Sequence, residues 1–425
     1  MSSLVSETDL ISVSASDVLS ASHRLKGISR ITPLEYNERL SHLFQAKIYL
    51  KREDLQVVRS YKLRGAYNKM SLLSPEAREQ GVVCASAGNH AQGVAFACQA
   101  LSVTGRIVMP VTTPRLKVSK VRKFGGPWVE VILKGDTFDD AYHHACTLAR
   151  QHDLVFVHPF DDPEVIAGQG TVGKEILDHC PTIPDMIVVP VGGGGLASGL
   201  SVYVNQLPKP PRLIGVEPMG APAMFESLKA GKTIMLDEIE KFVDGAAVRK
   251  VGELNFKICQ KGLERVLLVP EGRVCTALLE LYHEEAIVAE PAGALSVAAL
   301  DQLRDEIKGK TVVCILSGGN NDISRTEEIR ERSLLDQGLK HYFIVQFPQR
   351  AGALREFVAE VLGPEDDIVF FEYMKRNHRE TGPALVGIEY ADPSAHAALM
   401  ARMKTARFEF EPINGNPNLF HLLVS

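Results

Sequence analysis

The sequence lacks the features of a membrane protein or a nucleic-acid-binding protein. No uninterrupted apolar run approaches the ~18 residues that a membrane-spanning helix needs. Residues 1–20 mix serine with acidic side chains and lack the basic start and apolar centre of a signal peptide. The formal charge of −5 is mildly acidic, whereas a dedicated nucleic-acid binder normally carries a basic face. We therefore expect a cytoplasmic protein that binds neither membranes nor nucleic acid.

Paired cysteines and several common catalytic motifs are absent as well. The seven cysteines are scattered, and none is spaced C-x-x-C. Several lie in apolar stretches such as residues 311–316, which favours buried free thiols in a reducing compartment over disulfides or zinc ligands. The sequence contains neither H-E-x-x-H nor G-x-S-x-G, so zinc-protease and nucleophile-elbow chemistry are not expected.

The chain does contain enough apolar material for large cores. Hydrophobic residues are 45% of the sequence, which rules out disorder for most of it. At roughly 150 residues per domain, its length predicts two or three domains. From residue 80 to 318, short β-branched runs alternate with helical patterns, which is typical of parallel sheets covered by helices on both faces, with ligands bound at the carboxyl ends of the strands. The expected strands are residues 82–85, 106–111, 128–133, 154–157, 186–191, 212–218, 265–270 and 311–316.

The pattern changes near residue 333. Residues 333–340 read as a connector, and the residues after them predict the order βαββαβ of a ferredoxin-like α+β domain. We therefore divide the chain into residues 1–332, the connector 333–340 and a second domain at 341–425. The expected elements are strand 341–347, helix 352–363, strand 367–375, turn 377–382, strand 384–390, helix 393–404, strand 407–413 and a further strand 419–424 that extends the sheet.

Two early segments carry candidate functional residues. Lys62 lies in the segment 60–65, and taken alone it reads as a solvated lysine, since most lysines are exposed. Residues 84–93 follow an expected strand, and their small side chains let backbone N–H groups approach a ligand. Asn89 in this loop offers a donor and an acceptor. The alternative for the loop is a tight turn that Asn89 caps.

Two later loops also follow expected strands. A run of four glycines begins at Gly192, and free backbone amides next to a helix N-terminus form a cup for an anion, so we favour a phosphate over a purely structural loop. Gly192, Gly194 and Ala197 also satisfy G-x-G-x-x-A. A dinucleotide-binding fingerprint also has an acidic residue at the end of the next strand, and Glu217 stands there. An NAD-dependent dehydrogenase is therefore the rival interpretation. Ser317 follows the strand 311–316, either at the ligand edge of the sheet or as a helix N-cap.

Taken in this order, the loops resemble the fold-type II pyridoxal-phosphate enzymes. Several segments are similar, more narrowly, to the biosynthetic threonine dehydratases, and they are spread over most of the chain. They are KREDLQ (51–56), SYKLRGA (60–66), ASAGNHAQG (85–93), HPFDDPEVIAGQGT (158–171), VGGGGL (191–196), EPAGAL (290–295) and LSGGN (316–320). The resemblance implies an α/β fold of two open parallel-sheet lobes, like tryptophan synthase β, followed by an ACT-like domain.

The resemblance also implies roles for individual residues. Lys62 matches the lysine that forms the Schiff base with the aldehyde of pyridoxal 5′-phosphate. Asn89 matches the residue that bonds the 3′-oxygen of the cofactor ring, and Ser317 matches the partner of the ring nitrogen. The residues that match the phosphate loop are Gly192, Gly193, Gly194, Gly195 and Leu196. Those that lie where the family binds the substrate carboxylate are Ser86, Ala87, Gly88, Asn89 and His90.

The resemblance implies an enzyme that removes water and ammonia from L-threonine. L-serine is a second candidate substrate. With threonine the product is 2-oxobutanoate, at the first step of isoleucine biosynthesis. Isoleucine is expected to inhibit by binding the second domain of a homo-oligomer, a tetramer by analogy. The loop expected to bind it contains Gln349, Arg350, Ala351, Gly352, Ala353 and Leu354.

Departures from related serine racemases narrow this expectation. Ala87 stands where those enzymes place a second acid–base serine, so racemisation should be weak. Glu217 matches one of their divalent-ion ligands, but Ala223 stands where the second ligand, an aspartate, would be. We therefore expect no metal site there. For Glu290 the sequence leaves two roles open, that of a ligand for a monovalent cation and that of a buried structural carboxylate.

Three alternatives to threonine dehydratase stay open on the sequence. A related elimination or replacement enzyme, such as serine dehydratase or threonine synthase, would share the cofactor. An NAD-dependent dehydrogenase would be colourless and would bind dinucleotide. A catalytically inactive amino-acid sensor would bind isoleucine or valine without turnover.

Overall fold

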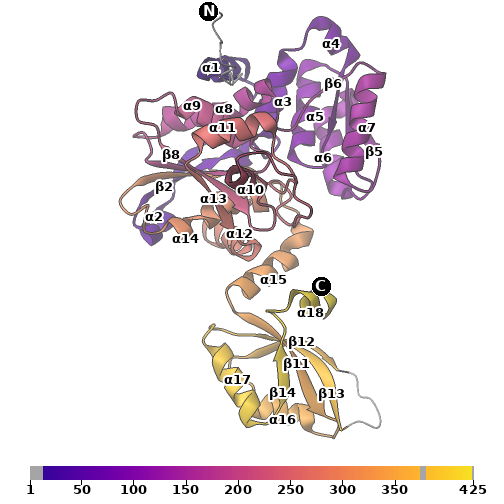
Figure 1. Ribbon diagram of the computed structural model, residues 1–425, viewed down its shortest axis with the longest axis vertical. Coiled ribbons are helices and arrows are strands. Elements are labelled where there is room, and N and C mark those ends of the chain that lie inside the picture. Colours follow the sequence, from indigo (N-terminus) through magenta and orange to yellow (C-terminus); the bar gives the residue numbers. More distant parts are fainter. Residues whose placement is uncertain (1–12, 374–379, 424–425) are drawn as a thin grey trace, which may run out of the picture. The chain divides into compact units, whose positions relative to one another are not determined.

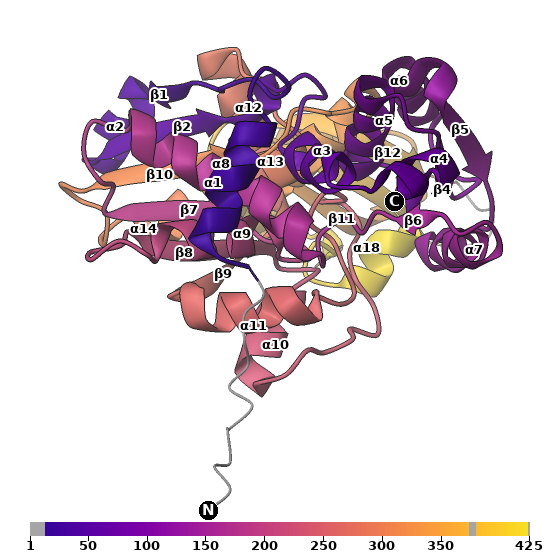
Figure 2. The same cartoon turned by 90° about the horizontal axis from the view of Figure 1, so that it is seen from above.

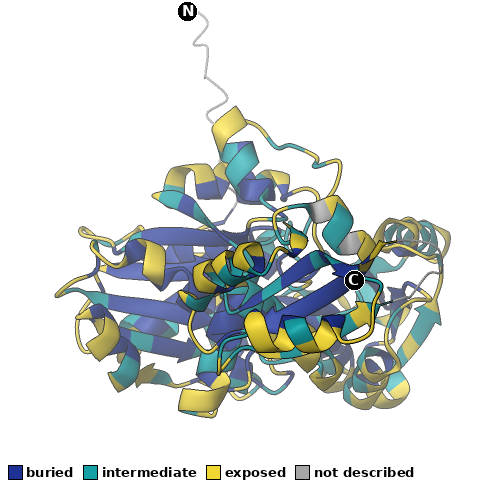
Figure 3. Ribbon diagram, turned by 90° about the horizontal axis from the view of Figure 1, so that it is seen from below, coloured by how far each residue is buried: buried dark blue, intermediate teal, exposed yellow. Residues whose placement is uncertain are grey.

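The computed structural model describes residues 13–373 and 380–423. Contacts within the chain divide it into two compact units (Figure 1). The first unit comprises Met1–Glu271 with Glu280–Asp322, and the second comprises Gly272–Leu279 with Ile323–Ser425. No helix in the described segments is both long and apolar enough to cross a lipid bilayer. The strands of the sheets are mostly buried, whereas most helices leave one side exposed (Figure 3).

The larger lobe of the first unit is built on a sheet of six strands (Figure 2). Its order is β1-β2-β10-β7-β8-β9, and every neighbouring pair is parallel except β1 with β2. The central strands are apolar and buried along their length, as expected for a sheet covered on both faces. The strands are β1 (Leu34–Tyr36), β2 (Lys47–Arg52), β10 (Thr311–Leu316), β7 (Met186–Pro190), β8 (Arg212–Pro218) and β9 (Arg265–Val269).

The helices of this lobe include one close-packed group. α3 (Lys62–Ser71) contacts α8 (Pro163–His179), which contacts α9 (Gly195–Val204). A Cβ atom at Gly168 would lie 2.6 Å from the carbonyl oxygen of Arg64, so the glycine is what lets α8 approach α3. The other helical segments are α1 (Ala15–Arg24), α2 (Glu38–Phe44), η1 (Glu53–Leu55), α10 (Ala223–Ala230), α11 (Glu253–Gly262), α13 (Pro291–Ala298) and α14 (Leu300–Leu303). Helix α12 (Glu271–Glu285) is divided between the two units, since residues 272–279 belong to the second.

The smaller lobe of the first unit is a four-stranded parallel sheet with helices around it. Its strand order is β5-β4-β3-β6, so β3 is internal and its carboxyl end is flanked by two neighbours. The elements are α4 (Pro75–Gln80), β3 (Val82–Ala85), α5 (Asn89–Leu101), β4 (Gly105–Met109), α6 (Arg115–Gly125), η2 (Gly126–Trp128), β5 (Val129–Leu133), α7 (Phe138–Gln151) and β6 (Val155–Phe156). The predicted strands of both lobes are confirmed to within two residues at each end.

The second unit carries the predicted ferredoxin-like domain. Its antiparallel sheet has the order β12-β13-β11-β14, and the element order βαββαβ is confirmed. Aromatic side chains fill its core, among them Phe343, Phe347 and Phe357. The elements are η3 (Ile323–Arg325), α15 (Thr326–Asp336), β11 (Lys340–Pro348), α16 (Ala353–Glu360), β12 (Asp367–Tyr373), β13 (Thr381–Glu389), α17 (Ala395–Thr405), β14 (Glu409–Pro412) and α18 (Pro417–Leu423).

Some expectations for the second unit differ from the structure. The predicted strand 419–424 is wrong, because these residues belong to helix α18, apart from residue 424, which lies outside the described residues. Parts of the predicted strand 367–375 and turn 377–382 also fall outside the described residues. Residues 333–336 form the last turn of α15, in which Ser333 is buried, so the expected connector begins inside a helix. The domain limits 1–332, 333–340 and 341–425 stay a prediction.

Candidate active site

Three of the four candidate loops begin at neighbouring strand ends. Strands β2, β10 and β7 are adjacent and parallel, so their carboxyl ends lie side by side at one edge of the sheet. The chain leaving β2 leads to Lys62, the chain leaving β10 begins with Ser317, and the chain leaving β7 enters the glycine run. The strand order therefore gathers segments that are more than a hundred residues apart in sequence.

The loop before Lys62 is fixed to the loop that contains Ser317. The N–H group of Tyr61 donates to the carbonyl oxygen of Ser317 at 3.2 Å, and that of Gly319 donates to the carbonyl oxygen of Arg59 at 2.9 Å. Lys62 is the first residue of α3, so its position is set jointly by this pairing and by the helix. The Ser317 side chain is 3% exposed, and its hydroxyl donates to the carbonyl oxygen of Ala292 at 3.3 Å.

The fourth loop, residues 86–90 after β3, comes from the smaller lobe. Gly93 on α5 brings this loop next to Lys62, because a Cβ atom there would lie 3.1 Å from the backbone of Leu63. Gly88 faces open space, with no heavy atom within 4 Å of where its Cβ would be. His90 is buried and its Nε2 atom lies 2.9 Å from the carbonyl oxygen of Val157. Burial lowers the pKa of His90 to about 3, so its ring is neutral.

The glycine run makes a cup that only glycines can form. Gly194 has φ of +98°, and a Cβ atom on Gly193 would collide with the ring of Phe160. Gly195 begins α9, and the first N–H groups of a helix have no intrahelical acceptor. Within the described segments, no backbone acceptor meets the N–H groups of Gly193 or Gly194. These donors fit a phosphate group.

The amine of Lys62 is held in a site that favours its neutral form. Burial lowers the pKa of Lys62, and the negative charges of Glu290 and Asp244 oppose that change only in part. A neutral amine is the form that can attack an aldehyde, whereas an exposed lysine at neutral pH is almost fully protonated. The bland interpretation of Lys62 as a solvated lysine is therefore not what the structure shows.

Asn89 links the two lobes through its side-chain amide. Its Nδ2 atom donates to Oε1 of Glu290 at 2.5 Å, and its Oδ1 atom accepts from Nδ2 of Asn320 at 2.8 Å. Asn320 also donates to the carbonyl oxygen of Val58 at 2.8 Å. The structure thus brings Asn89 to the same place as Lys62 and Ser317, and its amide is oriented by groups on both sides.

Glu290 is the group at this site whose role the sequence left open. It precedes α13 and is 6% exposed. Its pKa is raised to about 7, mainly by burial and to a smaller extent by the negative charge of Asp244. It contacts Asn89 and interacts electrostatically with Lys62, so it lies among the candidate site residues. Across the described segments, no group of three or more His, Cys, Asp or Glu side chains is placed to hold a metal ion.

Glu217 has a structural assignment of its own. Both of its carboxylate oxygens accept backbone N–H groups at the start of α10, Oε1 from Met224 and Oε2 from Phe225, each at 2.8 Å. Burial raises the pKa of Glu217 to about 8. The carboxyl group therefore caps a helix of the larger lobe, which is a role that its place at the end of β8 did not indicate.

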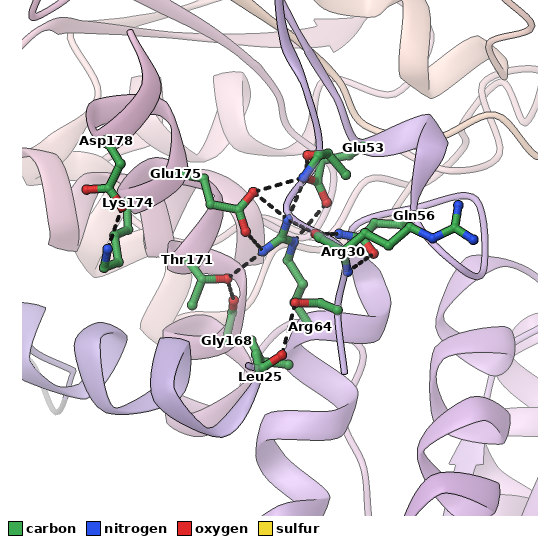
Figure 4. A network of polar contacts seen from close by, with 12 residues as sticks. Leu25, Arg30, Glu53, Gln56, Arg64, Gly168, Thr171, Lys174, Glu175 and Asp178 are labelled. Atoms are coloured by element: carbon green, nitrogen blue, oxygen red, sulfur yellow. Dashed lines mark hydrogen bonds and ion pairs between the residues drawn. The ribbon is translucent and has the colours of Figure 1, made fainter. Parts of the chain in front are cut away.

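A buried ionic cluster anchors the helix that begins with Lys62 (Figure 4). The guanidinium of Arg64 donates to Glu53, Glu175 and Thr171. Lys51 completes the cluster through Nζ, 2.5 Å from Glu175. Burial alone would lower the pKa of Arg64, but the attraction of Glu53 and Glu175 outweighs it, so that pKa is raised. The sequence motifs gave no signal for this cluster, because its members lie on separate elements.

The predicted effector loop lies in the second unit, between β11 and α16. Gln349, Arg350, Ala351 and Gly352 form it, whereas the predicted Ala353 and Leu354 are the first two residues of α16. Gly352 has φ of +88° and precedes the first turn of α16. The amide N and O atoms of Gln349 are buried and have no hydrogen-bond partner among the described residues. Arg350, in the loop, pairs with Glu356 of α16.

Two families match the sequence, one in each part of the chain. The family described as "Pyridoxal-phosphate dependent enzyme" matches residues 26–318. The family described as "C-terminal regulatory domain of Threonine dehydratase" matches residues 331–423. The first match spans all four loops of the candidate site, and the second spans the predicted effector loop.

Relatives similar over the full chain carry one description. The chain is 56% identical over 424 residues to "L-threonine dehydratase biosynthetic IlvA" of Bacillus subtilis strain 168, with 100% of both chains covered. It is 55% identical to the protein of the same description from Halalkalibacterium halodurans, covering 96% of this chain and 98% of the relative. Among solved structures, processed threonine deaminase isoform 2 from Solanum lycopersicum is 41% identical with a TM-score of 0.72, covering 76% and 87% of the two chains. The chain therefore belongs to the pyridoxal-phosphate dependent enzymes and, within them, to the biosynthetic threonine dehydratases.

Proposed function

We propose that this protein is a pyridoxal-phosphate-dependent lyase that converts L-threonine into 2-oxobutanoate and ammonia, the first step of isoleucine biosynthesis. The observation that carries the proposal is the convergence of a half-buried Lys62, a glycine cup and Ser317 on the ends of three neighbouring strands. When bound, pyridoxal phosphate supplies an aldehyde for covalent attachment and a ring that withdraws electrons from the α-carbon.

Each residue has a part in holding that group. Lys62 provides the neutral amine for the covalent bond, as its lowered pKa allows. The N–H groups of residues 193–196 bind the phosphate, because charge-assisted hydrogen bonds from amides contribute more than the helix dipole does. Asn89 would bond the 3′-oxygen, and Ser317 would be the partner of the ring nitrogen.

The chemistry of the chain's own groups is proton transfer. With threonine bound, the Nζ atom of Lys62 would take the proton from the α-carbon of the substrate. The bond from the β-carbon to the hydroxyl oxygen then breaks, and the hydroxyl leaves as water with one proton. The remaining skeleton takes up water and releases ammonia, so threonine yields 2-oxobutanoate and ammonia with no net consumption of water. Residues 86–90 hold the substrate carboxylate during these steps.

Ser317 and Ala87 favour elimination over other reactions. A neutral hydroxyl does not hold a ring nitrogen protonated as a carboxylate would, so electrons are withdrawn less strongly and prompt loss of the β-hydroxyl is favoured. Ala87 has no side-chain donor to return a proton to the opposite face of the α-carbon. We therefore expect little racemisation.

Borohydride reduction followed by peptide mass analysis tests the attachment. We expect the yellow holoenzyme to carry the reduced cofactor on Lys62, and the Lys62→Ala variant to carry none and to be inactive. Lys69 is a matched control, since it lies two turns further along α3 and pairs with Asp162. Label on another lysine, or normal threonine deamination by Lys62→Ala, would refute the proposal.

Substrate kinetics decide between this function and its relatives. A threonine dehydratase should have a higher kcat/KM for threonine than for serine. A serine dehydratase should prefer serine, and a threonine synthase should form threonine rather than consume it. The family match over residues 26–318 leaves the NAD-dependent dehydrogenase without support. Measurable turnover of threonine would exclude an inactive amino-acid sensor.

We further propose that isoleucine inhibits by binding residues 349–354 of the regulatory domain. Exposed amides ahead of α16 and the unpartnered Gln349 amide offer partners for an amino acid's carboxylate and ammonium groups. Gln349→Ala should raise the isoleucine concentration needed for half-inhibition, while Glu411→Ala, exposed on β14, should not. Unchanged inhibition in Gln349→Ala, or inhibition that survives deletion of residues 340–425 in an enzyme that still turns over threonine, would refute this site.

Such inhibition is expected to bias a two-state homo-oligomer. By analogy with the family we propose a tetramer. Light scattering coupled to size-exclusion chromatography should give about four times the 46.6 kDa chain mass. A monomer with full isoleucine sensitivity would contradict the oligomeric part of the proposal.

A further inference from the structure

We propose that Asp161 is a positioning residue that holds the glycine cup in the shape needed to bind phosphate, without touching the cofactor itself. This inference rests on the proposed function, because it assigns the cup to the cofactor's phosphate. It concerns three segments that lie against the cup, namely residues 158–161, residue 252 and the start of α11.

The carboxylate of Asp161 caps helix α11 from a distant part of the chain. Its oxygens accept the N–H groups of Glu253 and Leu254, each at 3.0 Å, across a separation of 92 and 93 residues. The residue at the N-cap position of α11 is Gly252, which has no side chain to do this. The carboxylate is also favourably placed at the positive end of the helix dipole. Asp161 therefore determines where α11 begins.

The start of α11 in turn holds the glycine cup. The N–H group of Gly252 donates to the carbonyl oxygen of Gly193 at 3.1 Å. Asn255 fits so closely against the cup that its Cβ atom would lie 2.7 Å from a Cβ atom on Gly194. A displacement of this first turn would therefore move the peptide groups that the proposed function assigns to the phosphate.

The residue before Asp161 supports the cup from another side. The Phe160 ring lies against Gly193, and the Phe160 carbonyl oxygen accepts from Nδ2 of Asn255 at 3.0 Å. The Asp161 N–H group donates to Nδ1 of His158 at 2.7 Å. Burial lowers the pKa of His158 to about 4, so Nδ1 is an acceptor at neutral pH. The segment is thus held at both its backbone and its side chains.

The physical benefit is preorganisation. A loop of consecutive glycines has more backbone freedom to lose than any other sequence, and it loses that freedom when it binds phosphate unless the protein has already fixed it. Fixing Gly193 and Gly194 through α11 and Phe160 removes that loss at the moment of binding. Removing the carboxylate should therefore weaken binding of the phosphate group specifically.

The test compares two ligands that differ only in the phosphate. Full-length apoprotein is titrated with pyridoxal 5′-phosphate and with pyridoxal, and binding is followed by visible absorbance. We expect Asp161→Ala to weaken binding of pyridoxal 5′-phosphate by about tenfold, since the lost hydrogen bonds are charge-assisted, and to leave pyridoxal within about twofold. The ³¹P resonance of the bound phosphate should broaden or shift in the variant. Asp161→Asn, which keeps the shape and one acceptor, should show a smaller effect in the same direction.

Asp162 supplies a matched control. It is the neighbouring residue and is itself the N-cap of α8, accepting the N–H groups of Glu164 at 2.9 Å and Val165 at 3.1 Å. Asp162→Asn should therefore leave the preference for the phosphorylated ligand unchanged. Equal losses for both ligands in the Asp161 variants, no loss at all, or the same phosphate-specific loss in Asp162→Asn would overturn the proposal. Wild-type protein that binds neither ligand would refute the proposed function instead.

Discussion

The side-chain amide of Asn89, at the start of α5, donates to the carboxyl group of Glu290, just before α13, across 2.5 Å. This hydrogen bond joins the smaller lobe to the larger one at the place where Lys62 and Ser317 meet. Because the pKa of Glu290 is raised to about 7, its proton is present on only part of the molecules at neutral pH. The orientation of Asn89 is therefore coupled to a group that titrates in the physiological range.

Replacing Glu290 should change how stability depends on pH. The pKa of Glu290 is about 7 in the folded protein and ordinarily 4.5, so the folded state holds a proton that the unfolded state releases between these values. Stability from this proton is fully present below pH 4.5 and is lost as pH rises through about 7. With 1.36 kcal/mol for each pH unit, the difference of about 2.5 corresponds to about 3 kcal/mol.

Glu290→Gln imitates the protonated form of Glu290, so it should remove the loss of stability that wild type shows as pH rises. We expect the melting temperature of the apoprotein variant to rise relative to that of wild type between pH 5 and pH 8. Differential scanning fluorimetry of both proteins at each pH measures it. A constant difference between the two proteins across this range would mean that Glu290 is ionised throughout.

Substitutions of two glycines at the site should affect cofactor binding and substrate binding separately. A Cβ atom on Gly193 collides with the ring of Phe160, so Gly193→Ala should weaken pyridoxal 5′-phosphate binding by tenfold or more, on the scale of about 1–3 kcal/mol for overpacking. A Cβ atom on Gly88 meets no neighbour, so Gly88→Ala should retain the cofactor and raise KM for threonine instead. Absorbance titration and steady-state kinetics measure the two effects. Equal effects of both substitutions on cofactor affinity would contradict this division.

The ionic cluster around Arg64 should be far more important for stability than an exposed pair nearby. Arg64→Met leaves the carboxylates of Glu53 and Glu175 with Lys51 as their remaining cation, and breaking a buried pair typically destabilises by about 3–5 kcal/mol. Lys174→Met removes an exposed pair with Asp178 on α8 and should cost less than about 1 kcal/mol.

Urea unfolding of the two apoproteins measures the difference between these variants. A further variant in which Glu53 and Glu175 are also neutralised should recover part of the stability lost in Arg64→Met, because the unpaired charges are then gone. Arg64→Met within about 1 kcal/mol of wild type would show that the cluster is not needed for folding.

Substitution of Ser317 should alter the outcome of the reaction more than the affinity for substrate. An aspartate at this position would hold the ring nitrogen protonated, strengthen electron withdrawal and slow the prompt loss of the hydroxyl group. We expect Ser317→Asp to raise the share of side reactions, including transamination, severalfold relative to 2-oxobutanoate formation. Product analysis together with the cofactor spectrum over time measures that ratio, with Ser317→Ala as the neutral control. An unchanged ratio in Ser317→Asp would contradict the role given to the hydroxyl.

The parts of the fold that could be predicted are those with strong local patterns. Buried parallel strands such as β7 and β10 are continuous apolar runs, and they were found to within two residues. The strand β2 was missed because its sequence, KIYLKR, begins and ends with charged residues, and Lys51 is buried in an ion cluster rather than exposed. The run 419–424 was predicted as a strand because a short apolar segment does not distinguish a strand from a helix.

The parts of the site that could be predicted are those carried by short motifs. Lys62, Asn89, the glycine run and Ser317 each stand in a recognisable segment, and the strand order brings them together. Asp161 and Arg64 act through partners far away in the sequence, so no local pattern reveals them. Glu290 was noticed, but its protonation depends on burial and on Asp244, which only the fold determines.

The close contacts between α3, α8 and α9 limit how this protein can be engineered. Replacing a helical glycine with alanine commonly stabilises a helix by about 0.5–1 kcal/mol, so such positions are attractive to anyone seeking a more heat-resistant catalyst. At Gly168 and Gly170, however, the added methyl group would lie 2.6 Å and 2.7 Å from carbonyl oxygens of the neighbouring helices. At Gly168 the substitution would push α3 outward and carry the reactive lysine with it, and at Gly170 it would push against α9. Libraries aimed at thermal tolerance should therefore leave these glycines fixed and vary the solvent-facing sides of the same helices.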